Sequence, residues 1–343
     1  MDEAKTDPTT SEGTTRRFFL GAAAGLTGAA LAATAAHAQG GDAAIAAAAD
    51  RSFTGGTLNL LIDKQQAGAL HSASGGEISS QVVLEKVGEG GIVKKHLAGI
   101  AYGEFDFRLD FPVSSNLGAE IQSMFDRTFD RFDGAFQMAD ASRKVVGERT
   151  FTNALITEVG FPACDAASKD TATLTVKVTP ETIKRTAKPS GTVPAPPKVK
   201  NVLTSNFKLA IGGLDCTRVS RIEAITVKLA VQDTGGVDLR DGLFFLEIPD
   251  LSITLLESSA QTWFDWFDDF VVKGNNDDTQ ERSGTLSLLS SDLKTTVASI
   301  SFSHLGIFGL EPTEDATGDS KTRRLRAQLY CEQMKLNIGG KAT

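Results

Sequence analysis

The chain has 343 residues, enough for about two domains. Its formal net charge of −8 excludes the strongly basic surface that a general nucleic-acid or anionic-membrane binder needs. Its 20 phenylalanines far outnumber its 2 tyrosines and 2 tryptophans. Because a phenyl ring has no polar tip, we expect these side chains in cores or at contacts between subunits.

The first 38 residues have the pattern of an export signal. Arg16 and Arg17 are followed by Phe-Phe-Leu, then by a weakly hydrophobic Ala- and Gly-rich run, and then by Ala36-His37-Ala38. This order resembles the twin-arginine (Tat) signal, whose machinery exports proteins that are already folded. We therefore expect residues 1–38 to be a signal peptide that meets the membrane only transiently and is cleaved after Ala38. The mature protein would reach the periplasm or the extracellular space.

A first unit is predicted over residues 57–183, after an Ala- and Gly-rich tether at 39–56. Residues 57–62 alternate between apolar and polar side chains and indicate a strand. Residues 65–76 are rich in Gly, Ser and Ala and indicate a loop, whereas 77–87 form a second predicted strand. A basic loop containing Lys94, Lys95 and His96 is expected next.

The centre of this unit has the strongest local patterns. Phe105, Phe107, Leu109 and Phe111 alternate with charged residues, as in a strand buried on one face. Ser114-Ser115-Asn116 can cap a helix. The helix that follows has apolar residues at 3–4 spacing: Leu117, Ile121, Met124, Phe125, Thr128 and Phe129.

Two further patterns complete the unit. Residues 144–162 are predicted to form a hairpin, and 171–178 a closing strand with strict alternation. A linker is expected at 184–200, which holds four of the ten prolines and several lysines.

The same order of patterns returns in residues 201–340. Residues 246–257 match the amphiphilic strand, a helix follows Ser258-Ser259, and a hairpin and a final strand end the unit. Phe267 lies 142 residues after Phe125, and Leu325 lies 151 residues after Leu174, so the drift is 9 residues. The sequence therefore predicts a mainly β protein of two tandem units, each with one helix.

The ordered motifs resemble the phage tail-tube family and the related Hcp-like tubes of contractile injection systems. In the first unit, the resemblance is carried by Lys95, Leu97, Gly99, Tyr102, Gly103, Phe125, Phe151, Asn153, Ala154, Phe161, Pro162 and residues 174–178. In the second unit, it is carried by Cys216-Thr217-Arg218-Val219-Ser220, Ile222-Glu223, Trp263, Trp266, Phe267, Leu310 and Pro312. The export signal and the doubling of the unit are departures from that family.

The resemblance implies that the two tandem units are small antiparallel β-barrels of tail-tube type, each with one flanking helix. It further implies a structural protein whose barrels pack into rings, usually of six units, which stack into a tube. A chain with two units would then form a homo-oligomer in which three chains make a pseudo-hexamer. Other components of a phage-like contractile assembly are its implied partners. The expected assembly contacts are the basic segment Lys94, Lys95 and His96 and the aromatic segment Trp263, Phe264 and Trp266.

Two other classes of function stay open. One is a periplasmic or cell-surface binding module for an envelope partner or a ligand. The other is an exported enzyme, which the residues do not favour because His71, His96 and His304 stand in no catalytic or zinc-binding motif. We therefore expect no catalytic residue, cofactor or metal. Cys164, Cys216 and Cys331 are expected to be mostly buried thiols, although one disulfide among them is possible.

Overall fold

The computed structural model describes residues 56–86, 92–195, 201–231, 244–313 and 323–338. The predicted signal peptide, with Arg16, Arg17, Ala36 and Ala38, lies outside the described residues, as does nearly all of the tether. Within the described ranges, the helices are too short or too polar to cross a bilayer.

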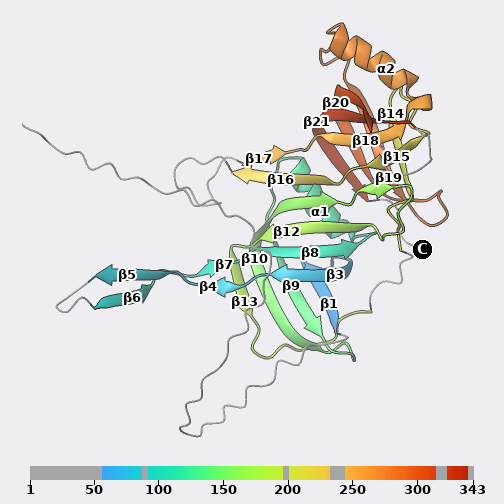
Figure 1. Cartoon of the computed structure of the whole chain (residues 1–343). Helices are drawn as coiled ribbons and strands as arrows, with labels where there is room; N and C mark the ends of the chain where they lie inside the picture. Colours follow the sequence, from blue (N-terminus) through green and yellow to red (C-terminus); the bar gives the residue numbers. More distant parts are fainter. Residues whose placement is uncertain (1–55, 87–91, 196–200, 232–243, 314–322, 339–343) are drawn as a thin grey trace, which may run out of the picture. The chain divides into compact units, whose positions relative to one another are not determined.

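Ten strands form the first sheet, and seven form the second (Figure 1). The first contains β1 (Thr57–Ile62), β2 (Gln65–Gln66), β3 (Ala69–Gly75), β8 (Phe105–Asp110), β9 (Phe132–Ala139), β10 (Val145–Phe161), β12 (Thr173–Thr179), β13 (Thr182–Arg185), β16 (Ile225–Val231) and β17 (Phe244–Glu247). The second contains β11 (Cys164–Asp165), β14 (Phe207–Ile211), β15 (Val219–Ile222), β18 (Leu251–Leu256), β19 (Arg282–Leu289), β20 (Thr296–Thr313) and β21 (Arg324–Ile338). Two short pairs stand beside them: β4 (Ile78–Ser79) with β7 (Ala101–Tyr102), and β5 (Val82–Lys86) with β6 (Val93–Leu97).

The two sheets pair their strands in the same order. In the first, the path runs β1-β9-β10-β12-β8-β3, and in the second it runs β14-β19-β20-β21-β18-β15. In each path, the end strand (β1 or β14) therefore lies beside the strand that follows the helix (β9 or β19). The prediction of a mainly β fold with one helix in each half is confirmed.

The irregularities of the long central strands also correspond. The β10–β12 pairing shifts between Ile156 and Glu158, and the β20–β21 pairing shifts between Ile307 and Gly309, at the same offset of 151 residues (307 − 156 and 309 − 158). Asn153 in β10 has φ of 52°, and His304 in β20, again 151 residues later, has φ of 56°. Because non-glycine residues seldom take a positive φ, this coincidence marks a matching bend in each strand.

Helix α1 (Ser115–Phe125) forms as its sequence predicts. The hydroxyl of Ser114 accepts a hydrogen bond from the Leu117 amide at 3.2 Å and caps the first turn. The predicted apolar stripe is buried from Leu117 to Phe125, whereas Thr128 and Phe129 lie beyond the end of the helix. The second helix, α2 (Gln261–Phe267), continues into a π-helical turn at Asp268–Val272.

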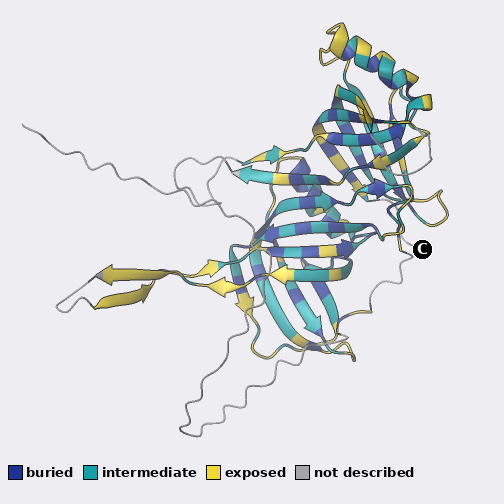
Figure 2. Ribbon diagram, viewed as in Figure 1, coloured by how far each residue is buried: buried dark blue, intermediate teal, exposed yellow. Residues whose placement is uncertain are grey.

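One large hydrophobic cluster contains residues of both sheets. Figure 2 shows buried residues along the strands of each sheet. Phe105, Phe107 and Leu109 of β8 are almost fully buried, as their alternation predicted. In the second sheet, Leu251, Ile253 and Leu255 of β18 follow the same alternation. Burial at every second position is what fixes the register of each strand.

Three local predictions are wrong. Residues 65–76 hold the strand β3 rather than a loop, because Ala69 to Gly75 pair with β8. The segment 144–162 is one continuous strand, β10, and not a hairpin. Residues 94–103 contain β6 and β7 rather than a basic loop.

The first part of the expected linker is built into the fold. Lys184 and Arg185 belong to β13, which pairs with β10. Val193 is buried with Ala139 and Val145. These contacts arise from segments distant in sequence, which composition does not reveal.

Candidate functional site

The most informative surface is where the second half of the chain joins the first sheet. Strand β16 pairs antiparallel with the end of β10, with Val227 opposite Val159 and Ile225 opposite Phe161. Val227 and Val159 are completely buried. The edge of β10 is thus covered by a strand that follows it by more than sixty residues, and the sheet continues across the boundary predicted between the units.

A carboxylate between two lysines reinforces this edge. Glu158 of β10 lies 3.3 Å from the Lys177 ammonium and 3.7 Å from the Lys228 ammonium. Only 19% of the Glu158 side chain is exposed, so these pairs are less screened than free surface pairs. One lysine comes from each half of the chain.

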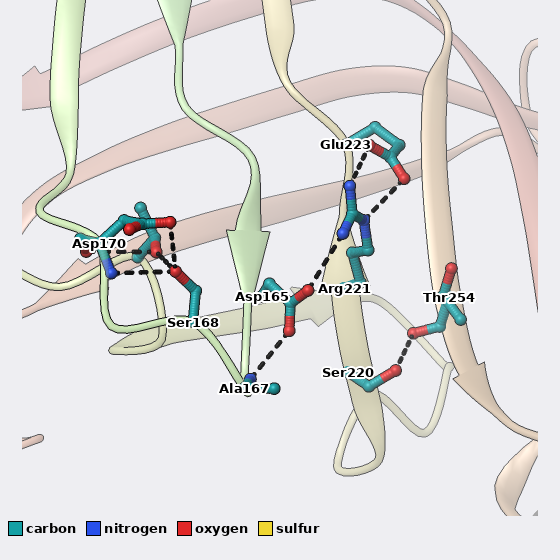
Figure 3. A network of polar contacts seen from close by, with 9 residues as sticks. Asp165, Ala167, Ser168, Asp170, Ser220, Arg221, Glu223 and Thr254 are labelled. Carbon is teal, nitrogen blue, oxygen red and sulfur yellow. Dashed lines mark hydrogen bonds and ion pairs between the residues drawn. The ribbon is translucent and has the colours of Figure 1, made fainter. Parts of the chain in front are cut away.

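A second junction is built around Arg221 (Figure 3). The short strand β11 pairs with β15, which places Asp165 opposite Arg221. The guanidinium donates to Asp165 Oδ2 at 3.1 Å and to both carboxylate oxygens of Glu223 at 2.8 and 3.1 Å. The bidentate bond to Arg221 lowers the pKa of Glu223, and the same bond raises the pKa of Arg221. The arrangement orients Arg221 and ties β11, which comes from the first half of the chain, to β15 within the second sheet.

A polar hollow of about 630 Å³ opens beside this network. Arg221, Arg324 and Arg326 contribute to its lining, together with Asp165 and Glu223. Arg326 also pairs with Glu311 at 3.8 Å. The hollow therefore mixes both signs of charge, and its arginine groups can engage carboxylate or phosphate oxygens.

The predicted basic contact residues lie on the hairpin formed by β5 and β6. Lys94, Lys95 and His96 are exposed, and His96 lies 3.5 Å from Glu85 on the opposite strand. Figure 2 shows exposed residues along the described length of this hairpin. The hairpin offers both cationic groups and backbone to a partner.

Apolar side chains are also exposed along this hairpin and its base. They include Ile78, Val82, Val83, Leu84, Ile92, Val93, Leu97 and Ile100. Exposed apolar residues gathered on one segment are typical of interaction surfaces. This exposed group was not predicted from the sequence, because part of the segment has the composition of a loop.

The aromatic contact residues on α2 mostly face the interior. Trp263 is fully buried and donates its indole N–H to the carbonyl of Asp215 at 2.9 Å. Trp266 is also buried, against Phe270 and beneath the guanidinium of Arg282. Phe264 is only partly buried. A partner chain could therefore reach Phe264, whereas the two tryptophans are part of the core.

One group within the described residues has metal-ligand chemistry: Glu281, His304 and Glu332, whose ligand atoms lie within 4.8 Å of one another. His304 Nδ1 lies 2.7 Å from Glu281, and the Tyr330 hydroxyl donates to the same carboxylate at 2.7 Å. Burial and the neighbouring Glu281 raise the pKa of Tyr330. These two bonds connect Glu281, just before β19, to the bend at His304 in β20 and to Tyr330 in β21.

The three cysteines are free thiols. Cys164 and Cys331 are buried, and Cys216 is partly exposed. Burial raises the pKa of the Cys164 thiol to about 12 and that of Cys331 to about 11. Neither buried thiol has the lowered pKa of a reactive nucleophile.

No protein-family model matches the sequence, and no curated protein matches it. Among solved structures, the chain is similar to a protein of the PVC sheath–tube complex, an extracellular contractile injection system, with 19% identity and a TM-score of 0.35. That match covers 38% of this chain and 89% of the other. A protein of the anti-feeding prophage cap is similar with 17% identity and a TM-score of 0.32, over 38% of this chain and 87% of its own length. Hcp1 from Flavobacterium johnsoniae is similar with 17% identity and a TM-score of 0.25, over 38% of this chain and 94% of its own length.

Proposed function

We propose that the mature chain is an exported, non-enzymatic structural protein. It consists of two copies of one tail-tube-like unit and self-associates into rings or a tube-like assembly. The observation that carries this proposal is the pairing of β16 with β10, in which the second half of the chain extends the sheet of the first. A unit that accepts a neighbour in this way within one chain is suited to accept further neighbours from other chains.

The duplication is supported by the pairing order and by the matching irregularities of β10 and β20. If both halves occupy equivalent positions, three chains supply the six units of one ring. The exposed hairpin with Lys94, Lys95 and His96 is the proposed contact to a further ring or to another component of a phage-like contractile assembly.

Self-association can be tested on residues 39–343, the predicted mature chain. Light scattering across a concentration series measures the molar mass directly. We expect masses that are multiples of the chain mass. If the hairpin joins rings, these masses should fall when Val83 and Leu84 on the hairpin are replaced by Ser. A monomer at every concentration would overturn the proposal.

Export by the Tat route, to the periplasm or beyond the cell, rests on Arg16 and Arg17. Replacing both with Lys keeps the charge but removes the arginine pair. We expect the variant to accumulate uncleaved inside the cell, and equal export of both forms would contradict the assignment.

A second candidate function is favoured by one observation, the polar hollow beside Arg221. Its volume of about 630 Å³ is in the range of small-molecule sites. In this alternative, the paired units form an envelope binding module for a ligand with carboxylate or phosphate groups. Two results together would favour this binding module over an assembly: the chain stays monomeric, and it binds such ligands in a way that Arg326→Ala abolishes.

A further inference from the structure

The junction inside the chain predicts a matching junction between chains. In the first sheet, β16 covers the edge of β10 from Glu158 to Phe161. Both valines at the centre of this pairing, Val159 and Val227, are fully buried. The corresponding edge in the second sheet belongs to β20.

The repeat between the two halves of the chain shows which residues of β20 form that edge. The offset of 151 residues between the bends of β10 and β20 carries Glu158 to Gly309 and Val159 to Leu310. Among the described residues, Gly309 to Thr313 pair with β21, on one side only. Leu310 is only partly buried, and Phe308 beside it is 46% exposed.

A second pair of register shifts identifies β4 as the strand that matches β16. The β3–β8 pairing shifts between Leu70 and Ser72, and the β15–β18 pairing shifts between Val219 and Arg221, an offset of 149 (219 − 70 and 221 − 72). This offset carries Val227 back to Ile78 in β4. Ile78 is 50% exposed, although its counterpart Val227 is fully buried.

We propose that β4 of one chain pairs antiparallel with β20 of a second copy, with Ile78 opposite Leu310. This inference rests on the proposed self-association and names its contact. The pairing would continue the second sheet of one chain into the first half of the next, as β16 continues the first sheet. Pro312, which has no N–H to donate, limits the pairing at that end.

A contact at the end of helix α1 also has an exposed counterpart in the second half of the chain. Inside the chain, the Phe129 ring, just after α1, packs on Phe244 of β17 at 5.5 Å. The offset of 142 between the helices carries Phe129 to Val271, which is 41% exposed after α2. Val271 is thus an exposed apolar side chain at a position whose counterpart, Phe129, contacts the second half of the chain. A head-to-tail contact of this kind closes into a ring when its rotation allows.

Paired cysteines test the register. Residues directly opposite in an antiparallel pair are close enough for a disulfide. In a Cys216→Ala background of residues 39–343, Ile78→Cys with Leu310→Cys should form crosslinked dimers and higher species under mild oxidation, seen on a non-reducing gel. Glu158→Cys with Lys228→Cys is the positive control, since these residues face each other within one chain and should crosslink without a change in mass.

The matched negative control joins Ile78→Cys with Leu293→Cys, which is 60% exposed in the β19–β20 turn. We expect at least ten-fold less intermolecular crosslinking than in the Ile78–Leu310 pair. If the chain self-associates but both pairs crosslink equally, the register is wrong and the proposed function stands. If the chain stays monomeric and no pair crosslinks between chains, both proposals fail.

Discussion

Truncation of a single buried valine measures how strongly the second half of the chain holds to the first sheet. Val227 in β16 is fully buried against β10. Val227→Ala removes two methyl groups, each worth about 0.8 kcal/mol of transfer free energy, and leaves a small cavity. We therefore expect the free energy of unfolding to fall by about 2–3 kcal/mol.

Urea unfolding of residues 39–343, followed by tryptophan fluorescence, gives this quantity. With a slope of about 3 kcal/mol per molar urea, the midpoint should fall by about 0.7–1 M. Lys228→Ala is the matched control, because Lys228 is the next residue in β16 and its side chain is 53% exposed. Its ion pair with Glu158 should contribute no more than about 1 kcal/mol.

The urea midpoints of the two variants test whether β16 packs on β10. Equal midpoints for Val227→Ala and Lys228→Ala would mean that β16 does not pack on β10 in solution. The continuous sheet, and the inference drawn from it for a second chain, would then lose their basis.

Three further predictions concern single residues. Ser114→Ala removes the helix cap and should lower the free energy of unfolding by about 1 kcal/mol, measured by urea unfolding, with no change in helix position. Trp263→Phe loses the hydrogen bond to the Asp215 carbonyl and should lower the free energy of unfolding by about 1–3 kcal/mol without altering the molar mass. A change in molar mass at unchanged stability would instead indicate that Trp263 contacts a partner. The raised pKa of Cys164 means that the folded state holds this proton more tightly than the unfolded state, whose thiol has a pKa of about 8.5. The contribution of this thiol to stability is complete below pH 8.5 and is lost as the pH rises toward about 12. Between pH 8 and pH 10, the free energy of unfolding should therefore fall less in Cys164→Ala than in the native chain. Equal falls would count against this prediction.

The elements that the sequence predicted correctly are those set by local pattern. The alternation around Phe107 and the capped stripe of α1 depend on neighbours a few residues away, and both formed as expected. Strand β3 was missed because its small residues are held by pairing with β8, which lies more than thirty residues further on. The unbroken path of β10 was missed because Asn153 bends the strand without ending it.

The candidate site was only partly predictable for the same reason. The basic residues from Lys94 to His96 are exposed as a contact surface requires. The burial of Trp263 and Trp266 depends on Asp215 and Arg282, which approach from other strands or loops. The pairing of β16 with the first sheet joins segments that the repeat pattern assigned to different units, and no local signal in either strand specifies its partner.

Electron microscopy of purified residues 39–343, the predicted mature chain, is the most direct test of ring formation. We expect closed rings with six similar lobes in class averages, and a mass corresponding to three chains in each ring. Particles that contain one chain with two lobes, at every concentration examined, would contradict it.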